Sequence, residues 1–485
     1  MDKDNKITRL LLVDLDGTLV STDTLWESCL LYIKKYPFKS WKLIKWLFSG
    51  RAYFKEQIAK KIIPNADVLP YQEKVIRYIS DAKDSGRDIY LITAANQRVA
   101  DSISKHFKIF TKTIGSESKL NLKGENKLNV IQNIIGTKLF DYVGNSKADI
   151  VIWEAAHTAI ISNGKYKMAS LLNKNKDQII VLPKEKENLF KKWIKTLRVH
   201  QWSKNGLLFL ALFMSHRIVE LNLFKQTVIA FLSFSLSASA VYILNDLFDL
   251  EADRKHPAKK DRPLASGRLP IVNGIIAIPS LLIISFLLAV SLLPNIFTII
   301  LIIYLITTTS YSIFLKEKLF LDVITLGVLY TLRVLAGGLA VGIEVSSWLL
   351  GFSLFFFLSL AFMKRYADLL LIKSNNQGEL FGRGYSIIDL DIVQKLGISS
   401  GFVSLLILAL YISSDQVIVL YKHPELIWLT IPILLYWLMR MWYVAHKGRM
   451  TDDPIIFAIK DKSSYAMFFL IIIILIIAAN LNISI

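Results

Sequence analysis

The stretch Asn245-Asp246-Leu247-Phe248-Asp249-Leu250-Glu251-Ala252-Asp253 directly follows an apolar run, 224–244, that is long enough to cross a membrane. Residues at positions i, i+3, i+4 and i+7 of a helix share one face. Within an arc of about 100°, that face carries Asn245, Asp246, Asp249 and Asp253. Three carboxylates on one face repel one another unless a cation lies among them, and Mg²⁺ takes such ligands together with water and phosphate. The stretch predicts a metal site; the alternative is a solvated helix end.

Basic residues follow this stretch, among them Lys259 and Arg262, and they are suited to neutralise the phosphates of a metal-bound ligand. Over the 485 residues the formal net charge is +19, which favours phosphate-rich ligands or an anionic membrane surface. The cations gather in loops between apolar spans. The sequence therefore predicts a membrane, and no nucleic acid, as the partner of these charges.

The apolar residues are concentrated beyond about residue 190. A mean hydropathy of +0.43 with 53% hydrophobic residues exceeds what a soluble protein of this size carries. About nine spans reach membrane length: 202–217, 224–244, 271–293, 295–314, 319–342, 346–370, 392–413, 425–444 and 463–483. The sequence predicts an all-α, multi-pass membrane domain over 198–485.

Lysine and arginine separate sharply by loop, which predicts the orientation. With a cytoplasmic N-terminus, most of them fall in inner loops, as the positive-inside rule requires. The N-terminal domain and the 245–253 stretch then face the cytoplasm from the inner membrane, and the C-terminus faces outward. Met1–Lys6 do not begin a signal peptide, and the single cysteine, Cys29, excludes an internal disulfide.

Residues 1–165 predict a separate α/β domain. Short apolar runs between helical patterns indicate strands at 10–13, 88–93, 140–144 and 158–161, and hence a parallel, Rossmann-like sheet with crossover helices. Asp14 and Asp16 follow the first run. A loop that leaves a buried strand is where many α/β proteins present catalytic side chains.

These residues resemble the haloacid dehalogenase superfamily. Its motifs are matched by Asp14 and Asp16, by Thr93 at the end of a strand, by Lys127, and by Asp149 in the run Gly144–Asp149. The resemblance implies that Asp14 attacks phosphorus, Asp16 serves as acid and base, and Mg²⁺ binds Asp14, Asp16 and Asp149. Thr93 and Lys127 would bind phosphoryl oxygens. The family implies an acid where this chain has Asn145, so a regulatory domain without phosphatase activity stays open as the alternative.

Two further segments connect this domain to the membrane part. Residues 24–83 look helical and are rich in lysine and aromatic side chains. In the resembled superfamily an insertion here forms a cap over the site, and these side chains also suit lipid headgroups; an ordinary amphipathic cap is the alternative. Residues 166–197 indicate a linker that ends in an interfacial helix, with Phe190 and Trp193 on one face.

Polar side chains beside or inside the apolar spans mark another candidate site: Lys204, Tyr311, Lys316, Asp322 and Arg333. All except Arg333 are expected at cytoplasmic ends of spans. An arginine inside a membrane span is functional by default, and its alternative role is to pair with an acid. On one continuous helix, Asp322 and Arg333 share a face about 16 Å apart.

With these residues, the region from about 195 to 485 resembles the UbiA superfamily of intramembrane prenyltransferases, and within it the decaprenyl-phosphate phosphoribosyltransferases. The resemblance rests on Arg198-x-x-Gln201-Trp202-x-Lys204-Asn205, on the 245–253 stretch continued to Arg262-Pro263, and on Tyr311-Ser312-x-x-x-Lys316 with Asp322. Aromatic prenyltransferases of the superfamily carry a second aspartate-rich motif after the fourth helix. Here that loop holds only Asp322, which favours the phosphoribosyl branch.

The resemblance implies a Mg²⁺-dependent transfer of phosphoribose from phosphoribosyl diphosphate to a polyprenyl phosphate, followed by removal of the 5-phosphate by the fused domain. Asp246, Asp249 and Asp253 would hold Mg²⁺, and Tyr311 would stabilise charge at the ribose. Substrate binding is assigned to Lys204, Asn245, Lys259, Arg262, Lys316, Asp322 and Arg333. A prenyltransferase with an aromatic or lipid acceptor and a transporter with a regulatory domain stay open as alternatives. The sequence allows an oligomer.

Overall fold

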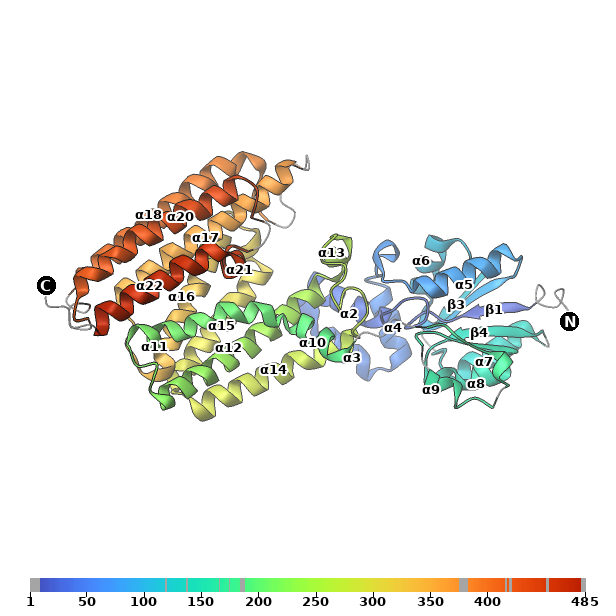
Figure 1. Cartoon of the computed structure of the whole chain (residues 1–485). Coiled ribbons are helices and arrows are strands. Elements are labelled where there is room, and N and C mark those ends of the chain that lie inside the picture. The colour runs from blue at the N-terminus through green and yellow to red at the C-terminus, as the bar shows by residue number, and fades with distance from the viewer. Residues whose placement is uncertain are drawn as a thin grey trace. The chain divides into compact units, whose positions relative to one another are not determined.

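The computed structural model (Figure 1) describes residues 9–117, 120–136, 138–164, 166–173, 175–183, 188–374, 383–414, 417, 421–450 and 453–480. Contacts between residues divide the chain into two compact units. The first unit joins Met1–Leu197 to Tyr242–Pro279, and the second joins Arg198–Val241 to Ser280–Ile485. The 245–253 stretch therefore folds with the N-terminal domain, although in the sequence it lies between membrane spans.

The first unit contains a parallel six-stranded sheet in the order β3-β2-β1-β4-β5-β6. Its strands are β1 (Leu10–Val13), β2 (Ile89–Asn96), β3 (Lys112–Ser116), β4 (Phe140–Gly144), β5 (Thr158–Ile161) and β6 (Ile179–Val181). Leu12 of β1 pairs with Tyr90 on one side and with Tyr142 on the other. The predicted parallel α/β fold is confirmed. The sheet also extends past residue 165, because β6 lies in the segment predicted to be a linker.

Helices cover both faces of this sheet, which explains why β1 is buried along its whole length. One face packs against α5 (Glu73–Asp84) and α6 (Gln97–Phe107) through aliphatic side chains such as Val75 and Val99. The other packs against α7 (Glu125–Ile135) and α8 (Ile150–Ala155), for example through Ile131. The short helix α9 (Tyr166–Ala169) adds Met168 and Ala169 to the second layer.

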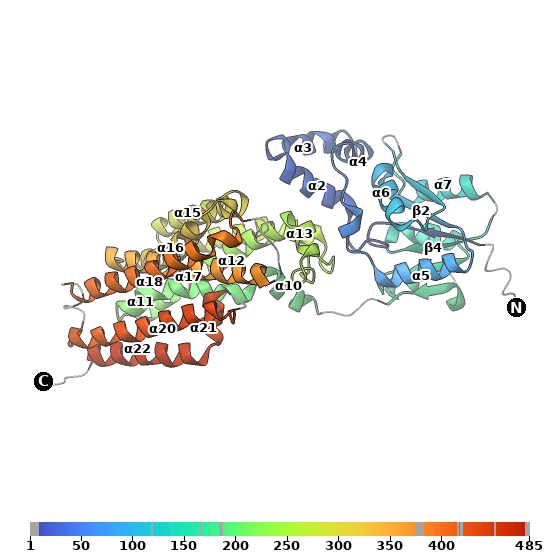
Figure 2. The same ribbon diagram turned by 90° about the horizontal axis from the view of Figure 1, so that it is seen from above.

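Three helices form an insertion between β1 and α5, which Figure 2 shows as a separate group beside the sheet. They are α2 (Thr24–Lys35), α3 (Trp41–Phe48) and α4 (Arg51–Ala59), with 3-10 turns η1 (Pro37–Lys39) and η2 (Ala66–Val68). Asp23 begins α2 by accepting hydrogen bonds from the backbone of Leu25 and Trp26. Cys29, Phe54 and Ile58 form a small core of their own. We call Thr24–Ala59 the cap; it confirms the predicted helical character of this segment.

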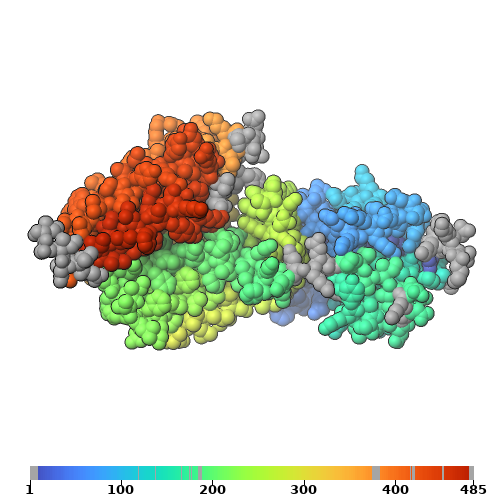
Figure 3. All heavy atoms as spheres, in the orientation of Figure 1, coloured from blue at the N-terminus to red at the C-terminus, as the bar shows by residue number. Residues whose placement is uncertain are grey.

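Eight helices in the described part of the chain are long and apolar enough to cross a membrane. They centre on α12 (Leu221–Phe248), α14 (Ile271–Leu292), α15 (Asn295–Ile313), α16 (Leu321–Val341), α17 (Ser347–Ser374), α18 (Leu390–Ile412), α20 (Thr430–His446) and α22 (Lys462–Asn480). In the space-filling view, the late helices, coloured orange to red, form one continuous surface (Figure 3). Outward aliphatic side chains such as Ile283 and Ile306 are about 60% exposed, which contact with lipid explains.

Shorter elements precede or connect these helices: α10 (Leu189–Leu197), η5 (Val199–Phe209), α11 (Leu210–Met214), α13 (Leu250–Lys255), η6 (Leu315–Glu317), η7 (Ile387–Asp389), η8 (Pro424–Leu429) and α21 (Pro454–Lys460). The N-terminal domain has two further 3-10 turns, η3 (Lys147–Asp149) and η4 (Lys176–Gln178). The helix α10 exposes Leu189 and Phe190, 61% and 70% accessible, along one side. That this helix lies at the membrane interface stays a prediction.

The first predicted span, 202–217, is not an α-helix of membrane length, and this part of the prediction was wrong. It forms the 3-10 helix η5 followed by α11, with 11 and 5 residues. Because a 3-10 helix rises about 2.0 Å per residue, the two together cover about 30 Å, the thickness of a bilayer core. The Leu208 carbonyl lies so close to α16 that a Cβ on Gly337 would collide with it. This segment is not among the helices of the described residues that are long and apolar enough to cross a membrane.

Candidate active sites

A chain of buried hydrogen bonds joins the predicted phosphatase residues at the carboxyl edge of the sheet. Lys127, on α7, donates from Nζ to Asp14 Oδ1 at 2.7 Å and to Tyr142 Oη at 2.9 Å. Tyr142 Oη donates in turn to Asp149 Oδ1 at 2.8 Å. Lys127, Asp14 and Asp149 are at most 8% exposed. The structure thus brings together the predicted nucleophile and the predicted phosphate-binding lysine, and burial raises the pKa of Asp14 against the opposing effect of Lys127.

Asp149 mainly organises the loop after β4. Its Oδ2 accepts hydrogen bonds from Asn145 N at 3.1 Å, from Ser146 N at 2.8 Å and from Ser146 Oγ at 2.8 Å. The Asn145 side chain packs on Gly17, where a Cβ would collide with it and φ is +72°. Asn145 is therefore the loop residue that lies against the turn carrying Asp14 and Asp16. Because three donors engage Asp149 Oδ2, its role as a metal ligand stays a prediction.

Asp16 lies where the sheet meets the cap. Its Oδ1 accepts a hydrogen bond from Thr24 N, the first residue of α2, at 2.8 Å. Burial, and then the charge of Asp23, raise the pKa of Asp16 to about 7, which suits a group that gives and takes protons near neutral pH. Thr93 is fully buried, and its Oγ1 accepts a hydrogen bond from Ala95 N at 3.0 Å.

Lys55, which the sequence prediction missed, reaches from the cap helix α4 to the sheet. Its Nζ donates to Ala94 O at 2.6 Å and to Asn121 Oδ1 at 2.9 Å. Burial lowers the pKa of this lysine, while the charges of Asp16 and Asp23 act in the opposite direction. The sequence carries no signal that separates Lys55 from the other lysines of the cap.

The aspartate segment (Asn245–Asp253) keeps its predicted spacing. Helical hydrogen bonds run through it, from Asp249 N to Asn245 O at 2.9 Å and from Asp253 N to Asp249 O at 2.8 Å, although α12 ends at Phe248 and α13 begins at Leu250. Asn245 is half-buried, as is Lys259 in the loop after α13. The helical face predicted from the sequence is thus present in the structure.

Arg262 brings two of the three aspartates together. Its Nη1 donates to Asp246 Oδ1 at 3.0 Å and to Asp253 Oδ2 at 2.6 Å. Both carboxylates are at most 4% exposed. Asp249, which lies between them in the sequence, accepts a hydrogen bond from Lys34 Nζ at 3.1 Å. A cation therefore already lies between Asp246 and Asp253, which is what two buried carboxylates require.

This arrangement fits a magnesium ion at Asp246 and Asp253. Carboxylate oxygens are the protein ligands that Mg²⁺ prefers, and it commonly takes one or two of them and fills its shell with water and substrate phosphates. Over the described ranges, three or more His, Cys, Asp or Glu side chains nowhere form a ready metal cluster. The site therefore matches a metal that arrives with a phosphorylated substrate better than one held by the protein alone.

The cap contacts the aspartate segment within the first unit, and the sequence gave no indication of this. Arg254 forms two parallel hydrogen bonds with Glu27 of α2, Nη2 to Oε1 at 2.5 Å and Nη1 to Oε2 at 3.1 Å, and its Nε donates to Ala265 O at 2.7 Å. The two side chains are 6% and 2% exposed. Lys34 also donates to Phe248 O at 2.8 Å. A buried ion pair thus joins the N-terminal domain to α13.

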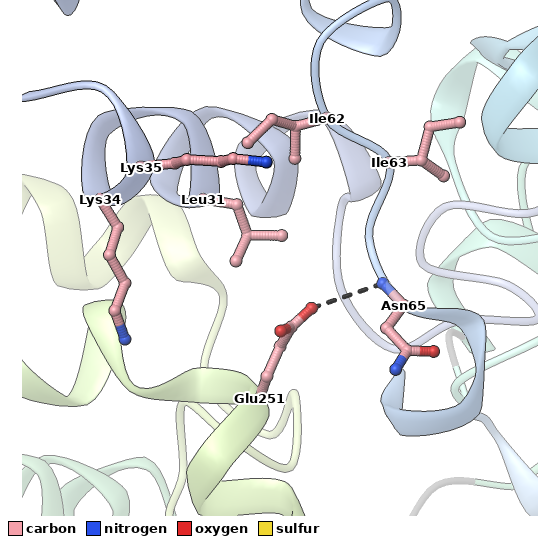
Figure 4. Close-up of a pocket in the computed structure, with 7 residues that line it drawn as sticks. All are labelled: Leu31, Lys34, Lys35, Ile62, Ile63, Asn65 and Glu251. Carbon is pink, nitrogen blue, oxygen red and sulfur yellow. Dashed lines mark hydrogen bonds between the residues drawn. The ribbon is translucent and has the colours of Figure 1, made fainter. Parts of the chain in front are cut away.

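A pocket of about 320 Å³ lies beside these contacts, and Figure 4 shows Glu251 extending toward Asn65 within it. The Asn65 backbone donates to Glu251 Oε1 at 3.4 Å. The pocket is lined by Leu31, Lys34, Lys35, Ile62, Ile63, Asn65 and Glu251. It therefore combines two lysines with aliphatic walls, one carboxylate and one amide, all from the first unit.

In the second unit, two lysines converge on one aspartate. Lys204 Nζ and Lys364 Nζ lie 2.9 Å and 3.1 Å from Asp453 Oδ2. We call these three residues the lysine cluster. Although burial raises the pKa of Asp453, the neighbouring charges of Lys364 and Lys204 lower it well below its usual range. The cluster carries one excess positive charge and is suited to a phosphate; Asp452, from the same predicted loop, lies outside the described residues.

Tyr311 and Asp322 belong to a separate network around two arginines that the prediction did not include. Arg365, 2% exposed, donates from Nε to Asp322 Oδ2 at 2.5 Å, and Tyr385 Oη donates to Asp322 Oδ1 at 2.5 Å. Arg383 Nη1 donates to Tyr311 Oη at 2.8 Å and to Lys316 O at 3.4 Å. Asp322 itself is fully buried. Its internal partners indicate a structural role, and its assignment to substrate binding stays a prediction.

Arg333 is also enclosed by protein. Its Nε donates to Asn205 Oδ1 at 2.9 Å, and its Nη2 donates to Tyr304 Oη at 3.1 Å. Its guanidinium carbon lies 5.0 Å from the centre of the Tyr304 ring and 5.3 Å from that of Tyr330. The partners are polar and aromatic groups, not the acid that the sequence reasoning considered. Arg333 and Asp322, on the same helix, thus take part in separate networks.

In the described part of the chain, eight membrane-length helices and a buried aspartate pair at and just beyond the end of one of them indicate a multi-pass membrane protein. The model of the "UbiA prenyltransferase family" matches residues 207–472. A protein of Sinorhizobium fredii named "Uncharacterized protein y4nM" is 37% identical over 94% of this chain and 88% of its own length. The chain belongs to the UbiA prenyltransferase family.

Two further likenesses each cover part of the chain. Decaprenyl-phosphate phosphoribosyltransferase of Mycobacterium tuberculosis is 34% identical over 38% of this chain, and the match covers 61% of that enzyme's length. The solved structure of a UbiA homolog from Archaeoglobus fulgidus bound to DMAPP and Mg²⁺ matches 59% of this chain and 99% of its own, with 16% identity and a TM-score of 0.45.

Proposed function

We propose that the chain transfers phosphoribose from phosphoribosyl diphosphate to a polyprenyl phosphate, and that its N-terminal domain then removes the 5-phosphate of the product. The observation that carries the first part is the buried pair of Asp246 and Asp253 bridged by Arg262. Asp246 and Asp253 would hold the metal of a diphosphate, which would neutralise the leaving group, and Arg262 would bind the phosphates. The likeness to decaprenyl-phosphate phosphoribosyltransferase supports this donor and this class of acceptor.

In the proposed transfer, the bond between the anomeric carbon and the diphosphate breaks, and an oxygen of the acceptor phosphate forms the new bond. Mg²⁺ on the aspartate segment would neutralise the leaving diphosphate. Lys259 and Arg262, from the loop after α13, would bind its oxygens. The lysine cluster, which belongs to the second unit, would bind a substrate phosphate, because Lys204 and Lys364 together exceed the charge of Asp453. The acceptor phosphate is already an anion, so no strong general base is needed.

In the proposed second reaction, an Asp14 oxygen attacks phosphorus and the bond to the ribose oxygen breaks. Asp16 donates a proton to that oxygen and later takes one from the water that hydrolyses the aspartyl-phosphate. The bond from Lys127 to Asp14 and the raised pKa of Asp16 support these roles. Asp16 is bonded to the first residue of the cap, and the cap carries the Glu27–Arg254 pair, so one short helix, α2, contacts both candidate sites.

The test uses the full chain in lipid nanodiscs with Mg²⁺, phosphoribosyl diphosphate and polyprenyl phosphate, followed by mass spectrometry of the lipid. We expect a polyprenyl-phosphate ribose without the 5-phosphate, and no product when Mg²⁺ is chelated. If the protein ignores phosphoribosyl diphosphate but joins a prenyl diphosphate to 4-hydroxybenzoate, the aromatic prenyltransferase reaction replaces this proposal.

One variant should distinguish the two proposed reactions. Asp14→Asn removes the proposed nucleophile at nearly constant side-chain volume, so transfer should proceed at its normal rate and the lipid should keep its 5-phosphate. The same mass spectrum measures both outcomes. Asp84→Asn serves as a control, because Asp84 is exposed at the end of α5. If the parent protein and Asp14→Asn give lipid of the same mass, the N-terminal domain does not act on this product.

A further inference from the structure

The outward face of the cap is apolar to an unusual degree for a domain without a membrane span. On η1 and α3, five large side chains are between 52% and 94% exposed: Phe38, Trp41, Ile44, Leu47 and Phe48. Trp41, Ile44 and Phe48 follow the i, i+3, i+7 spacing of one helical face. Contiguous exposed apolar surface of this kind marks an interaction site.

The cap does not need these side chains for its own folding. The opposite face of α3 supplies Leu43 and Trp46, which pack against the small core of Cys29, Phe54 and Ile58. The inward and outward faces of α3 are therefore both apolar, and the inward one contributes to this small core. The exposed outward face is available to an occupant from outside the domain.

Lysines surround this face. Lys35, Lys39, Lys42 and Lys45 come from the end of α2, from η1 and from α3. Lys39 Nζ lies 5.9 Å from the centre of the Tyr36 ring, and Lys42 Nζ lies 5.9 Å from that of Trp41. Tryptophan and lysine beside an apolar face are the residues that anchor a helix at the interface of an anionic bilayer.

We propose that the segment Phe38–Phe48, here called the cap patch, rests in the surface of an anionic lipid bilayer. The occupant is a lipid because the chain itself crosses the membrane through α12 and seven further helices, so a bilayer is always within reach of this domain. The charge of the surrounding lysines also matches anionic headgroups better than a second copy of this basic chain. This inference stands apart from the proposed reactions. If those also hold, the cap patch keeps Asp14 close to lipid-linked substrate.

The test measures the surroundings of the patch directly in the full chain. Ile44→Cys is labelled with an environment-sensitive fluorophore, and the protein is reconstituted at one chain per nanodisc with or without anionic lipid. The thiol of Cys29 is buried, and burial raises its pKa to about 12, so it does not compete for the label. Ser85→Cys, on an exposed turn after α5, is the matched control.

With anionic lipid, the Ile44→Cys label should emit at shorter wavelength than the Ser85→Cys label. Nitroxide-bearing lipids should quench it several-fold more strongly, and the difference should shrink without anionic lipid. Equal quenching of both labels by a water-soluble quencher would overturn the proposal. So would a shielded Ile44→Cys label that lipid nitroxides do not quench, because that result would place protein, not lipid, on the patch.

Discussion

Among the described residues of the first unit, the two candidate sites both hold a cation against buried carboxylates, and they differ in how that cation is held. In the sheet, Lys127 is 3% exposed and bonded to Asp14, while hydrogen bonds from backbone and side chains engage Asp149. In the aspartate segment, the cation is Arg262, 28% exposed and carried by a loop. The first cluster is rigid before substrate arrives. In the second cluster the cation is partly exposed, so a metal that arrives with the substrate could take its place between the carboxylates.

Breaking the second cluster should have the largest effect. Asp246→Asn removes the charge that Mg²⁺ and Arg262 share, and phosphoribosyl transfer should fall by more than about 10²-fold, or about 3 kcal/mol of barrier. Initial rates of lipid product formation measure the loss. Asp261→Asn, an exposed aspartate in the same loop, should leave the rate unchanged. Near-normal turnover of Asp246→Asn would show that the metal binds elsewhere.

Separating the cap from the aspartate segment should have the next largest effect. Glu27→Gln leaves the buried guanidinium of Arg254 without a carboxylate, and loss of one partner of a buried pair costs about 3–5 kcal/mol of folding free energy. The first unit should unfold at lower temperature, and transfer should fall about tenfold. Thermal unfolding and rate assays measure the two effects.

The matched control is Glu73→Gln, since Glu73 is 84% exposed and pairs only with the exposed Arg77. Asp14→Asn, which acts on the phosphatase chemistry alone, should not share the loss of transfer. If Glu27→Gln keeps both its unfolding temperature and its transfer rate, the cap does not position the aspartate segment.

Weakening the lysine cluster should have a smaller effect. Lys204→Ala leaves Asp453 with Lys364 alone and removes the excess positive charge, so the KM for polyprenyl phosphate should rise about tenfold with little change in kcat. Lys395→Ala, a 69% exposed lysine on α18, is the control. A fall in kcat at constant KM would instead place Lys204 in the transition state of the transfer.

The predicted orientation of the membrane part is tested by labelling introduced cysteines, since it cannot be read from a reaction rate. Loop charges predict that positions 260 and 316 face the cytoplasm, so Lys260→Cys and Lys316→Cys should resist a membrane-impermeant thiol reagent in intact cells. Val219→Cys, 86% exposed and in a predicted outer loop, should react. Strong external labelling at position 260 would reverse the predicted orientation.

The sequence predicted what depends on local patterns. Buried apolar runs located β1, β2, β4 and β5, hydropathy located eight membrane helices, and the spacing of the aspartate segment survives in its helical hydrogen bonds. The Glu27–Arg254 pair joins residues 227 positions apart, so no local pattern records it. The same holds for Lys364 and Asp453, and for Arg365 and Asp322, which meet only when helices pack.

The conformation of the first span could not be predicted from the sequence either. Hydropathy does not distinguish a 3-10 helix, with hydrogen bonds from i to i+3, from an α-helix, with hydrogen bonds from i to i+4. Only the contact of Leu208 with Gly337 offers a reason for the narrower helix there. A glycine pair inside an apolar run, Gly337 and Gly338, was the available signal.

The 3-10 helix η5 has a mechanical consequence. Its 11 residues extend about 22 Å, and the same residues in an α-helix would extend about 16.5 Å. The difference of about 5.5 Å equals one turn of α-helix. Lys204 and Asn205 lie inside this element and form hydrogen bonds with Asp453 and Arg333, so a change from 3-10 to α-helical hydrogen bonding would shift both side chains along the helix axis relative to these partners.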